Sequence, residues 1–481
     1  MKVQLFGVGT KSTSPAITAQ KRINCYVEHR HEQDKTSLAL VGRPGLDLFV
    51  SSSVLGINPS RGMWAVNTLA APLLFTVHSG TLYSVNNAGA TNIIGSIAST
   101  SGDVSMADDG KYLVLVDGSK GYWYNMQTPG ALTLITDGNF TTSPKTVTWQ
   151  DNYFIVNAGS SRQFQLSQIS PSVDPAVWPA IQIGFAQSSP GTLTAVQADH
   201  SILNIFGDVY SEFWQDNGTP DMPYGQVPGS AAEFGLASAF SLSKFDNSLT
   251  GLFKNKMGAV NVSRLQGFAL RKLSDSDMDQ ILSQYAASDI GQAVGCAFMI
   301  GGHPIYLLNV DGTDTWAYDG LSNVWSEWQS TTGGRFLGQK FAAFQGMLLL
   351  SDYSTGTIYE LDPTVYDDTG NTYGMEVWSK HIWNDDKYIG ISQVQIDIES
   401  GSGTATGQGV NPVMDLQVSK DGGQSFFSVG YSSMGPIGNY TTRCIWRGLG
   451  AARDWVLKLR ITDPIHRVVT GATAELTGWS F

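Results

Sequence analysis

Adjacent carboxylates are the residues in this sequence that come closest to a catalytic arrangement. A glycosidase needs two carboxyl groups about 5 to 10 Å apart, one as the acid and the other as the nucleophile or base. Three stretches of the chain hold adjacent aspartates: Asp108 with Asp109, Asp367 with Asp368, and Asp385 with Asp386. All three lie in turn-rich, hydrophilic contexts, and neighbouring residues on a strand point to opposite faces. We therefore expect solvated loops at these positions, without a catalytic pair.

The stretch "SKDGGQSFF", from Ser419 to Phe427, resembles the Asp-box turn of sialidases and related propeller hydrolases. In those proteins the turn recurs in several blades, on the face away from the active site, whereas here it occurs once. An aspartate in such a turn accepts hydrogen bonds from the backbone and stabilises the hairpin. We predict that Asp421 has this structural role and that Phe426 covers the hairpin.

Other catalytic and metal-binding patterns are missing from the sequence. The seven histidines do not form an H-E-x-x-H motif, and neither a phosphate-binding G-x-x-x-x-G-K-[ST] loop nor a G-x-S-x-G elbow occurs. Cys25, Cys296 and Cys444 lie far apart without a C-x-x-C pair, which argues against a zinc site and a disulfide framework. We therefore predict no catalytic residue, no metal ligand and no cofactor, and a protein that is not an enzyme.

Charge and hydropathy exclude two further classes of function. Lys and Arg number 29 against 41 Asp and Glu, which gives a net charge of −12, and no run of like charges forms a basic arm. Tight DNA binding is therefore not expected. No signal-peptide pattern and no stretch of about 18 apolar residues occurs, so we expect a protein that is made in a cytoplasm and does not insert into a membrane.

The elements that must position these residues are strands. The chain holds 53 Gly, many aromatic residues and only 15% charged residues, a balance typical of an all-β protein. Five hairpin patterns recur along it: "LLFTVHSGTLYSV", "YLVLVDGSKGYWYNM", "YFIVNAGSSRQFQLS", "IYLLNVDGTDTWAYDG" and "MLLLSDYSTGTIYEL". From Tyr83 to Tyr124 is 41 residues, from Tyr124 to Phe164 is 40, and from Tyr318 to Tyr359 is again 41.

This spacing is typical of four-stranded β-propeller blades, whose period is about 40 to 50 residues. Two longer repeats fill the gap, with aromatic or apolar anchors near Trp214 and Leu270. We predict a propeller over residues 56–370, with seven blades favoured and six possible. The anchor side chains are expected to pack between blades.

Two regions lie outside the repeats. Residues 1–55 show no helical periodicity and contain a turn at Arg43, Pro44 and Gly45, so we expect an extended arm and a short hairpin that pack on a neighbour or close the propeller. Residues 376–481 alternate like a small β-sandwich, with five strand patterns: "SQVQIDIE", "VMDLQVS", "FFSVGYS", "WVLKLRI" and "GATAELTGW". The best helix candidate is 274–286.

Several stretches together resemble the tail hub, or nozzle, proteins of short-tailed bacteriophages of the P22 kind, also called packaged-DNA stabilisation proteins. The likeness begins with Gln20, Arg22, Asn24, Tyr26 and the Pro44-Gly45 turn. It continues through a central segment and a later one: Phe206, Gly207, Glu212, Trp214, Gly218, Gly229, Glu233 and Gly235, then Gly302, His303, Thr315, Trp316, Tyr318, Asp319 and Trp325. The likeness covers about residues 14 to 370. At residues 326–329 this chain differs, because the family resemblance predicts a more basic stretch there.

The resemblance implies a structural protein of the virion tail, without enzymatic activity. It implies a homo-oligomer, a ring of six beneath the portal and adaptor proteins, that extends the DNA channel, helps to retain the packaged genome and anchors tail fibres, spikes or a needle. Double-stranded DNA would pass through without specific binding, and assembly would take place in the host cytoplasm. The alternative left open by the residues is a propeller that binds or hydrolyses carbohydrate, which two convergent carboxylates in a concave pocket would favour.

Overall fold

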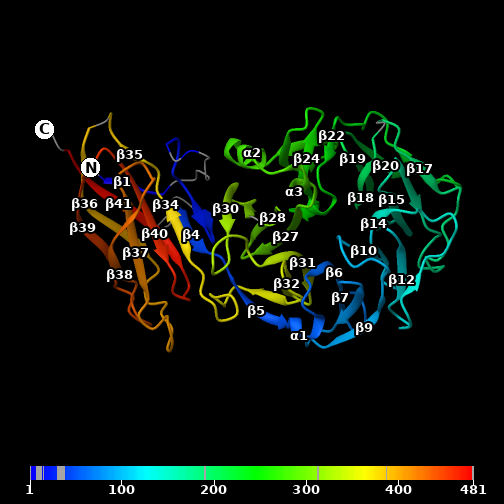
Figure 1. Cartoon of the computed structure of the whole chain (residues 1–481), viewed down its shortest axis with the longest axis horizontal. Helices are drawn as coiled ribbons and strands as arrows, with labels where there is room; N and C mark the ends of the chain where they lie inside the picture. The colour runs from blue at the N-terminus through cyan, green and yellow to red at the C-terminus, as the bar shows by residue number, and fades with distance from the viewer. Residues whose placement is uncertain are drawn as a thin grey trace.

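The protein is described by a computed structural model that covers residues 2–6, 14, 16–29, 38–188, 191–310, 312, 314–385 and 387–478. Asp386, one of the six candidate aspartates, lies outside the described residues. The described chain forms a β-propeller and a β-sandwich side by side (Figure 1). The predicted all-β fold, with a propeller followed by a sandwich, is confirmed.

Four blades follow one another in the first half of the propeller, and each is an antiparallel sheet of four sequential strands. Their strands are β6 (Ser60–Val66), β7 (Leu73–His78), β8 (Thr81–Val85) and β9 (Thr91–Ser96); β10 (Ser105–Asp108), β11 (Tyr112–Val116), β12 (Gly121–Asn125) and β13 (Thr133–Leu134); β14 (Pro144–Gln150), β15 (Tyr153–Ala158), β16 (Gln163–Leu166) and β17 (Ile183–Phe185); β18 (Leu193–Asp199), β19 (Ile202–Gly207), β20 (Ser211–Asp216) and β21 (Tyr224–Gln226). The second and third strands of these blades are the hairpins that the sequence pattern marks.

Three further blades complete the circle, so the described residues form seven. Their strands are β22 (Phe234–Leu236), β23 (Ser243–Phe245), β24 (Ser248–Asn255), β25 (Val260–Gln266) and β26 (Ala269–Lys272); β27 (Val294–Ile300), β28 (His303–Asn309), β29 (Thr315–Asp319) and β30 (Val324–Trp328); β31 (Gly338–Phe344), β32 (Met347–Asp352), β33 (Ile358–Asp362) and β5 (Gly45–Val50). We number the blades 1 to 7 in this order. The first strands contact one another around the centre, and β31 contacts β6.

Blade 7 takes its outermost strand from the N-terminal part of the chain. Strand β5 pairs antiparallel with β33, with Leu48 opposite Tyr359 and Asp47 opposite Glu360. The circle is therefore closed by hydrogen bonds between distant parts of the chain, which protects an edge that blade 7 would otherwise expose. Gly45 begins β5 where a Cβ atom would lie 2.2 Å from the carbonyl oxygen of Asp367, so the backbones approach too closely for any side chain there.

The aromatic anchors pack between blades, as predicted. The ring of Tyr124 lies 6.0 Å from Phe75 in blade 1, and the ring of Phe164 lies 5.1 Å from Trp214 in blade 4. Tyr124 and Phe164 are buried and occupy the third strands of their blades. Such rings fill the space between neighbouring sheets that no single blade can bury alone.

Blade 5 departs from the predicted repeat. We expected an anchor of the repeat near Leu270, and this residue lies on β26, the outermost strand, whereas the anchors Tyr124 and Phe164 lie on third strands. The reason is an interrupted first strand: β22 and β23 both pair with β24 and are separated by the short 3-10 helix η1 (Ala239–Ser241). The inserted residues lengthen the blade and shift the apolar pattern by one strand.

The C-terminal domain is a sandwich of two sheets. One sheet has the order β3-β4-β41-β36-β39 with β1 paired to β41, and the other has the order β34-β40-β37-β38 with β35 paired to β40. The strands are β1 (Lys2–Gln4), β3 (Cys25–His29), β4 (Leu38–Gly42), β34 (Met375–Trp378), β35 (Ile382–Trp383), β36 (Ile389–Ile398), β37 (Val413–Ser419), β38 (Phe427–Ser433), β39 (Cys444–Ala452), β40 (Asp454–Ile461) and β41 (Val468–Gly478). Their inner faces share one apolar core, in which Val394 of one sheet and Leu416 of the other are buried.

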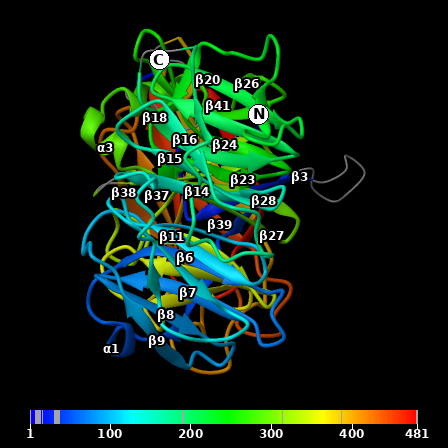
Figure 2. The same ribbon diagram turned by 90° about the vertical axis from the view of Figure 1, so that its right-hand side faces the viewer.

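The N-terminal segment contributes strands to both domains. Strands β1, β3 and β4 belong to the sandwich, β5 belongs to blade 7, and the two-residue strand β2 (Arg22–Ile23) lies between the domains. We expected an extended arm and a short hairpin here, with a turn at Arg43, Pro44 and Gly45. Strands β3 and β4 do pair as a hairpin, but the expected turn instead joins β4 of the sandwich to β5 of blade 7. Figure 2 shows the propeller in front of the sandwich.

Helices are short. They are α1 (Ser52–Leu55), α2 (Ser276–Leu282) and α3 (Ala287–Gly291). Helix α2 lies inside the predicted range 274–286, and Asp275 caps it by accepting a hydrogen bond from the backbone N–H of Met278. Across the described residues, no helix combines the length and apolar character needed to cross a lipid bilayer.

Candidate functional site

The strongest concentration of buried polar contacts lies where the propeller meets the sandwich. Strand β2 pairs in parallel with β30 of blade 6, where Ile23 lies opposite Glu327, and antiparallel with β34 of the sandwich, where Arg22 lies opposite Val377. The two domains therefore share one continuous sheet of ten strands. The Nζ atom of Lys21 lies 3.2 Å from a carboxylate oxygen of Glu327, which adds an ion pair beside this splice.

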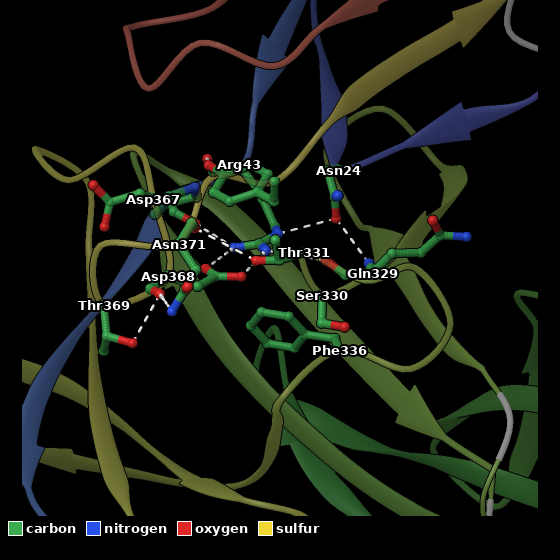
Figure 3. Close-up of polar contacts among 12 residues, drawn as sticks. Asn24, Arg43, Gln329, Ser330, Thr331, Phe336, Asp367, Asp368, Thr369 and Asn371 are labelled. Carbon is green, nitrogen blue, oxygen red and sulfur yellow. Dashed lines mark hydrogen bonds and ion pairs between the residues drawn. The ribbon is translucent and has the colours of Figure 1, made fainter. Parts of the chain in front are cut away.

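Arg43 is the centre of the junction (Figure 3). Its Nη1 and Nη2 atoms donate to the two carboxylate oxygens of Asp368, at 2.9 and 2.7 Å. Its Nε atom donates to the side chain of Asn24, and its remaining two N–H groups donate to the backbone carbonyls of Pro44 and Gln329. All five donors of a fully buried guanidinium are thus satisfied, by groups from the N-terminal segment, blade 6 and the linker to the sandwich.

Aromatic rings enclose the same guanidinium. Its central carbon lies 3.7 Å from the ring centroid of Tyr373 and 4.7 Å from that of Phe336. Burial alone would lower the pKa of Arg43, but Asp368 and Tyr373 outweigh it and raise the pKa above its usual value. The cation is therefore retained inside the protein, because both its charge and its donors are compensated.

Asn24 also links the N-terminal segment, blade 6 and the linker to the sandwich. Its backbone adopts a left-handed conformation, with φ at 55°, and its backbone N–H donates to the carbonyl of Glu327 at 2.8 Å. The side-chain oxygen accepts from Arg43 and from the backbone N–H of Gln329, while the side-chain nitrogen donates to the carbonyl of Gly374. Asparagine tolerates this backbone conformation better than most residues and offers both donor and acceptor.

A second buried arginine completes the cluster from the sandwich side. The guanidinium of Arg467 lies 4.4 Å from the ring of Tyr373, so two arginines flank one tyrosine. Arg467 donates to the backbone carbonyls of Asp463 and Tyr366, and burial lowers its pKa. The Tyr373 hydroxyl donates to the carbonyl of Arg43. We call this set, with Asn24, Arg43, Asp368, Tyr373 and Arg467, the junction cluster.

The junction cluster is suited to holding the two domains together rather than to catalysing a reaction. Its carboxylate is occupied by both nitrogens of Arg43, and every one of its five residues is buried. Removing one partner of such a buried ion pair costs about 3–5 kcal/mol, because the other charge stays buried without compensation. The arrangement therefore holds the two domains in one orientation.

The candidate aspartates take three different roles. Asp109 accepts hydrogen bonds from the backbone N–H groups of Lys111 and Tyr112, and Asp367 accepts from Gly370, as turn residues do. Asp108 accepts from the indole N–H of Trp64 at 2.7 Å. The expectation of a solvated loop is wrong for Asp368, which is 1% exposed because Arg43 neutralises it.

The turn at Asp421 is structural, as predicted. The carboxylate accepts hydrogen bonds from the backbone N–H groups of Gln424 and Ser425 and from two serine hydroxyls, which lower its pKa well below the usual value. The ring of Phe426 lies 4.6 Å from that of Trp378, so it covers the sheet beside the turn.

Residues of the central stretch also hold the propeller together. Glu212 is buried, and its carboxylate accepts from the indole N–H of Trp214 at 2.9 Å and from the backbone of Ser188. A Cβ atom on Gly235 would lie 2.2 Å from the carbonyl of Asp208, which explains why a glycine stands where blades 4 and 5 meet. These positions point to packing, with no group free for chemistry.

An open cleft of about 480 Å³ lies on the rim between blades 4 and 5. It is lined by Asp199 and His200 of blade 4 and by Arg264, Phe268 and Arg271 of blade 5, among other residues. Asp199 is its one lining carboxylate within the described part of the chain, and it contacts His200 at 2.9 Å. The acid pair that glycoside hydrolysis requires is therefore not assembled there.

Lys340 contacts side chains from other blades of the propeller. The Nζ atom of Lys340, on the first strand of blade 7, lies 2.5 Å from a carboxylate oxygen of Asp103, which precedes blade 2. The same atom lies 5.2 Å from the ring of Phe240 in η1 of blade 5.

Cysteines and metal ligands add no further site. Cys25, Cys296 and Cys444 are buried and form no disulfide, and burial raises the pKa of the Cys25 and Cys296 thiols to about 12. Such thiols stay protonated and unreactive. Among the residues that the structure describes, no group of three His, Cys, Asp or Glu side chains is placed to share a metal ion.

Comparison with solved structures shows other propellers. A virginiamycin B lyase from Staphylococcus aureus is 8% identical, with a TM-score of 0.42, and the match covers 63% of this chain and 94% of that one. The WD40 β-propeller domain of Doa1 is 7% identical, with a TM-score of 0.38, and the match covers 69% and 98%. A search of curated proteins found no match.

Family models identify both domains. The model described as "Bacteriophage P22 Gp10, beta-propeller" matches residues 5–366, and the model described as "Bacteriophage P22 Gp10, beta-sandwich" matches residues 374–477. The two matches meet at the linker that carries Asp368 and Tyr373, where the junction cluster joins the domains. The chain belongs to the bacteriophage P22 Gp10 family, whose members are structural proteins of the phage tail.

Proposed function

We propose that this protein is a hub, or nozzle, of a short phage tail: a ring of six copies beneath the portal and adaptor. The ring extends the DNA channel, helps to retain the packaged genome, and carries the tail fibres, spikes or needle. Assembly takes place in the host cytoplasm before the protein becomes part of the virion. Membership of the family supports this proposal at the level of a structural tail protein.

The observation that carries the proposal is the buried junction cluster. A tail component must transmit force between the head and the host surface, so its domains need a fixed orientation. Arg43 with its five satisfied donors, together with the sheet that runs through β2 from blade 6 into the sandwich, provides one. Interfaces between domains that lack such contacts permit relative motion as the default.

The charge of the chain suits a conduit for DNA. A copy carries −12, so a ring of six is strongly acidic, and phosphates sliding past meet few cations that would bind them. Each Lys or Arg that contacts phosphate adds binding that has to be broken during passage. The DNA partner is therefore transient and contacted without sequence specificity.

Mass measurement of the purified protein tests the proposal. We expect mass photometry to detect a species of six times the monomer mass, either alone or after addition of the portal and adaptor proteins of the same phage. The control is the same mixture with a portal from an unrelated tail type. A protein that stays monomeric and binds neither connector protein would overturn the proposed function.

A further inference from the structure

Two pairs of like charges face each other across the outermost strands of the propeller. In blade 5, Arg264 on β25 lies directly opposite Arg271 on β26. In blade 7, Glu360 on β33 lies directly opposite Asp47 on β5. Like charges in directly opposed positions destabilise a sheet, so each pair is locally unfavourable. Exceptions of this kind to local rules are expected at functional surfaces.

The basic pair lines the cleft between blades 4 and 5. Arg264 reaches Asp246 at 2.6 Å, whereas Arg271 is exposed and makes no hydrogen bond or ion pair among the described residues. Phe268, at the tip of the same hairpin, is 43% exposed. The cleft thus offers an unpaired guanidinium beside an exposed ring, a combination that is enriched at protein interfaces.

The acidic pair lies at the outer edge of blade 7. Within the described residues neither Glu360 nor Asp47 has a cationic partner, and burial, Asp362 and Asp47 together raise the pKa of Glu360. Leu48, which follows Asp47 on β5 and points to the opposite face of the sheet, is 53% exposed. The outer edge of blade 7 therefore presents two carboxylates whose repulsion no cation relieves within the described residues.

The two surfaces are complementary in charge and lie on different sides of the same propeller. Blade 6, which carries the sandwich through β30 and β2, separates them, as Figure 1 shows for β24 at the top and β5 below. One copy can therefore use both surfaces at once. Contacts between two different surfaces of identical chains are heterologous and generate rings when the rotation closes.

We propose that the Arg264 and Arg271 surface of one copy docks on the Asp47 and Glu360 surface of the next copy. The inference rests on the proposed function, because it names the contact that would build the ring. A single salt-linked interface relieves both like-charge pairs, and it excludes the same surface of a second copy by repulsion. Phe268 supplies apolar area beside the basic pair.

Charge reversal with complementation tests the contact. The first variant carries R264E and R271E, and the second carries D47K and E360K. Each alone is expected to require at least a tenfold higher concentration for ring formation by mass photometry. An equimolar mixture is expected to assemble again, because each variant keeps one native surface and gains the complement of the other's altered one. The variants K387E with R443E, and D221K with D385K, are exposed controls with the same changes in charge.

The outcomes separate this inference from the proposed function. If wild type and both reversal variants form the same ring at the same concentration, the contact is wrong and the hub function stands. If the wild type neither assembles nor binds the connector proteins, the hub function itself fails. Should a reversal variant melt at a lower temperature than wild type, R264Q with R271Q replaces it, and failure of this neutral variant to weaken assembly would also refute the contact.

Discussion

Replacing Asp368 with asparagine removes the one carboxylate that neutralises Arg43. Asparagine has nearly the same shape, so the change deletes a charge and one acceptor while leaving the packing of the junction cluster intact. Arg43 donates to the two oxygens of Asp368 at 2.9 and 2.7 Å, and in the variant one of these N–H donors faces an amide N–H instead of an oxygen. Arg43 stays fully buried in either case.

The size of the effect follows from that burial. Breaking a buried ion pair by removing one partner costs about 3–5 kcal/mol, because the remaining charge has no water to solvate it. Replacing both partners by apolar residues, as in Arg43→Met with Asp368→Leu, removes the charge as well and is expected to cost less than Asp368→Asn alone. Comparing the single and the double variant separates the energetic cost of the uncompensated charge from the cost of the lost contacts.

Hydrogen exchange is the appropriate assay, since a protein of two domains need not unfold in a single step. We expect Asp368→Asn to speed exchange selectively in β2, β30 and β34, and to lower the urea midpoint followed by tryptophan fluorescence. The exposed Asp221→Asn is the matched control. A loss of less than about 1 kcal/mol, the value typical of an exposed pair, would refute the role assigned to the junction cluster.

Three further predictions concern single positions. Gly45→Ala places a Cβ atom 2.2 Å from the carbonyl of Asp367. We therefore expect thermal unfolding to show that the free energy of unfolding falls by about 1–3 kcal/mol or more. The control Gly130→Ala, in an open turn, should change it little. Burial alone would raise the pKa of Asp319, but hydrogen bonds from His303, Ser322 and a backbone N–H outweigh it and lower the pKa below 3.8. This stabilisation is present at neutral pH and is lost as the pH falls through the folded-state pKa, so Asp319→Asn should flatten the dependence of stability on pH below about pH 4, and an unchanged slope would contradict the assignment. Asp421→Ala should speed amide exchange at Gln424 and Ser425 while leaving ring assembly unchanged, and a loss of assembly would show a role beyond the turn.

The propeller was predictable because its signal is local. Each blade repeats a hairpin of second and third strands, and the anchor rings of Tyr124 and Phe164 recur with it every forty residues or so. The repeat of blade 5 was expected, but its interrupted first strand was not, because η1 leaves no periodic signal in the sequence. Strands β37, β38 and β40 of the sandwich were likewise evident from alternation, but β39 was not, since its exposed residues are Arg447 and two glycines in place of a regular polar pattern.

The junction cluster was only partly predictable. The resemblance to the tail hub family drew attention to Asn24 and to the turn after Arg43, but nothing local shows that Arg43 binds Asp368, which lies 325 residues away in sequence. One signal was present: Arg43 directly follows "LALVG", a strand with a buried centre. A buried arginine at such a position requires a carboxylate partner, and its identity depends on long-range packing.

The pairing of β5 with β33, and of β1 with β41, sets the order in which the protein can be completed during synthesis. At about 5–20 residues per second, β5 leaves the ribosome roughly 15 to 60 s before β33 exists, so blades 1 to 6 form an unfinished array with an open edge during that time. Such edges recruit other unpaired strands. A chaperone therefore benefits this nascent chain most while the propeller edge is open, before the last hundred or so residues emerge. A copy truncated before β33 has no partner for β5 and cannot cap its own propeller.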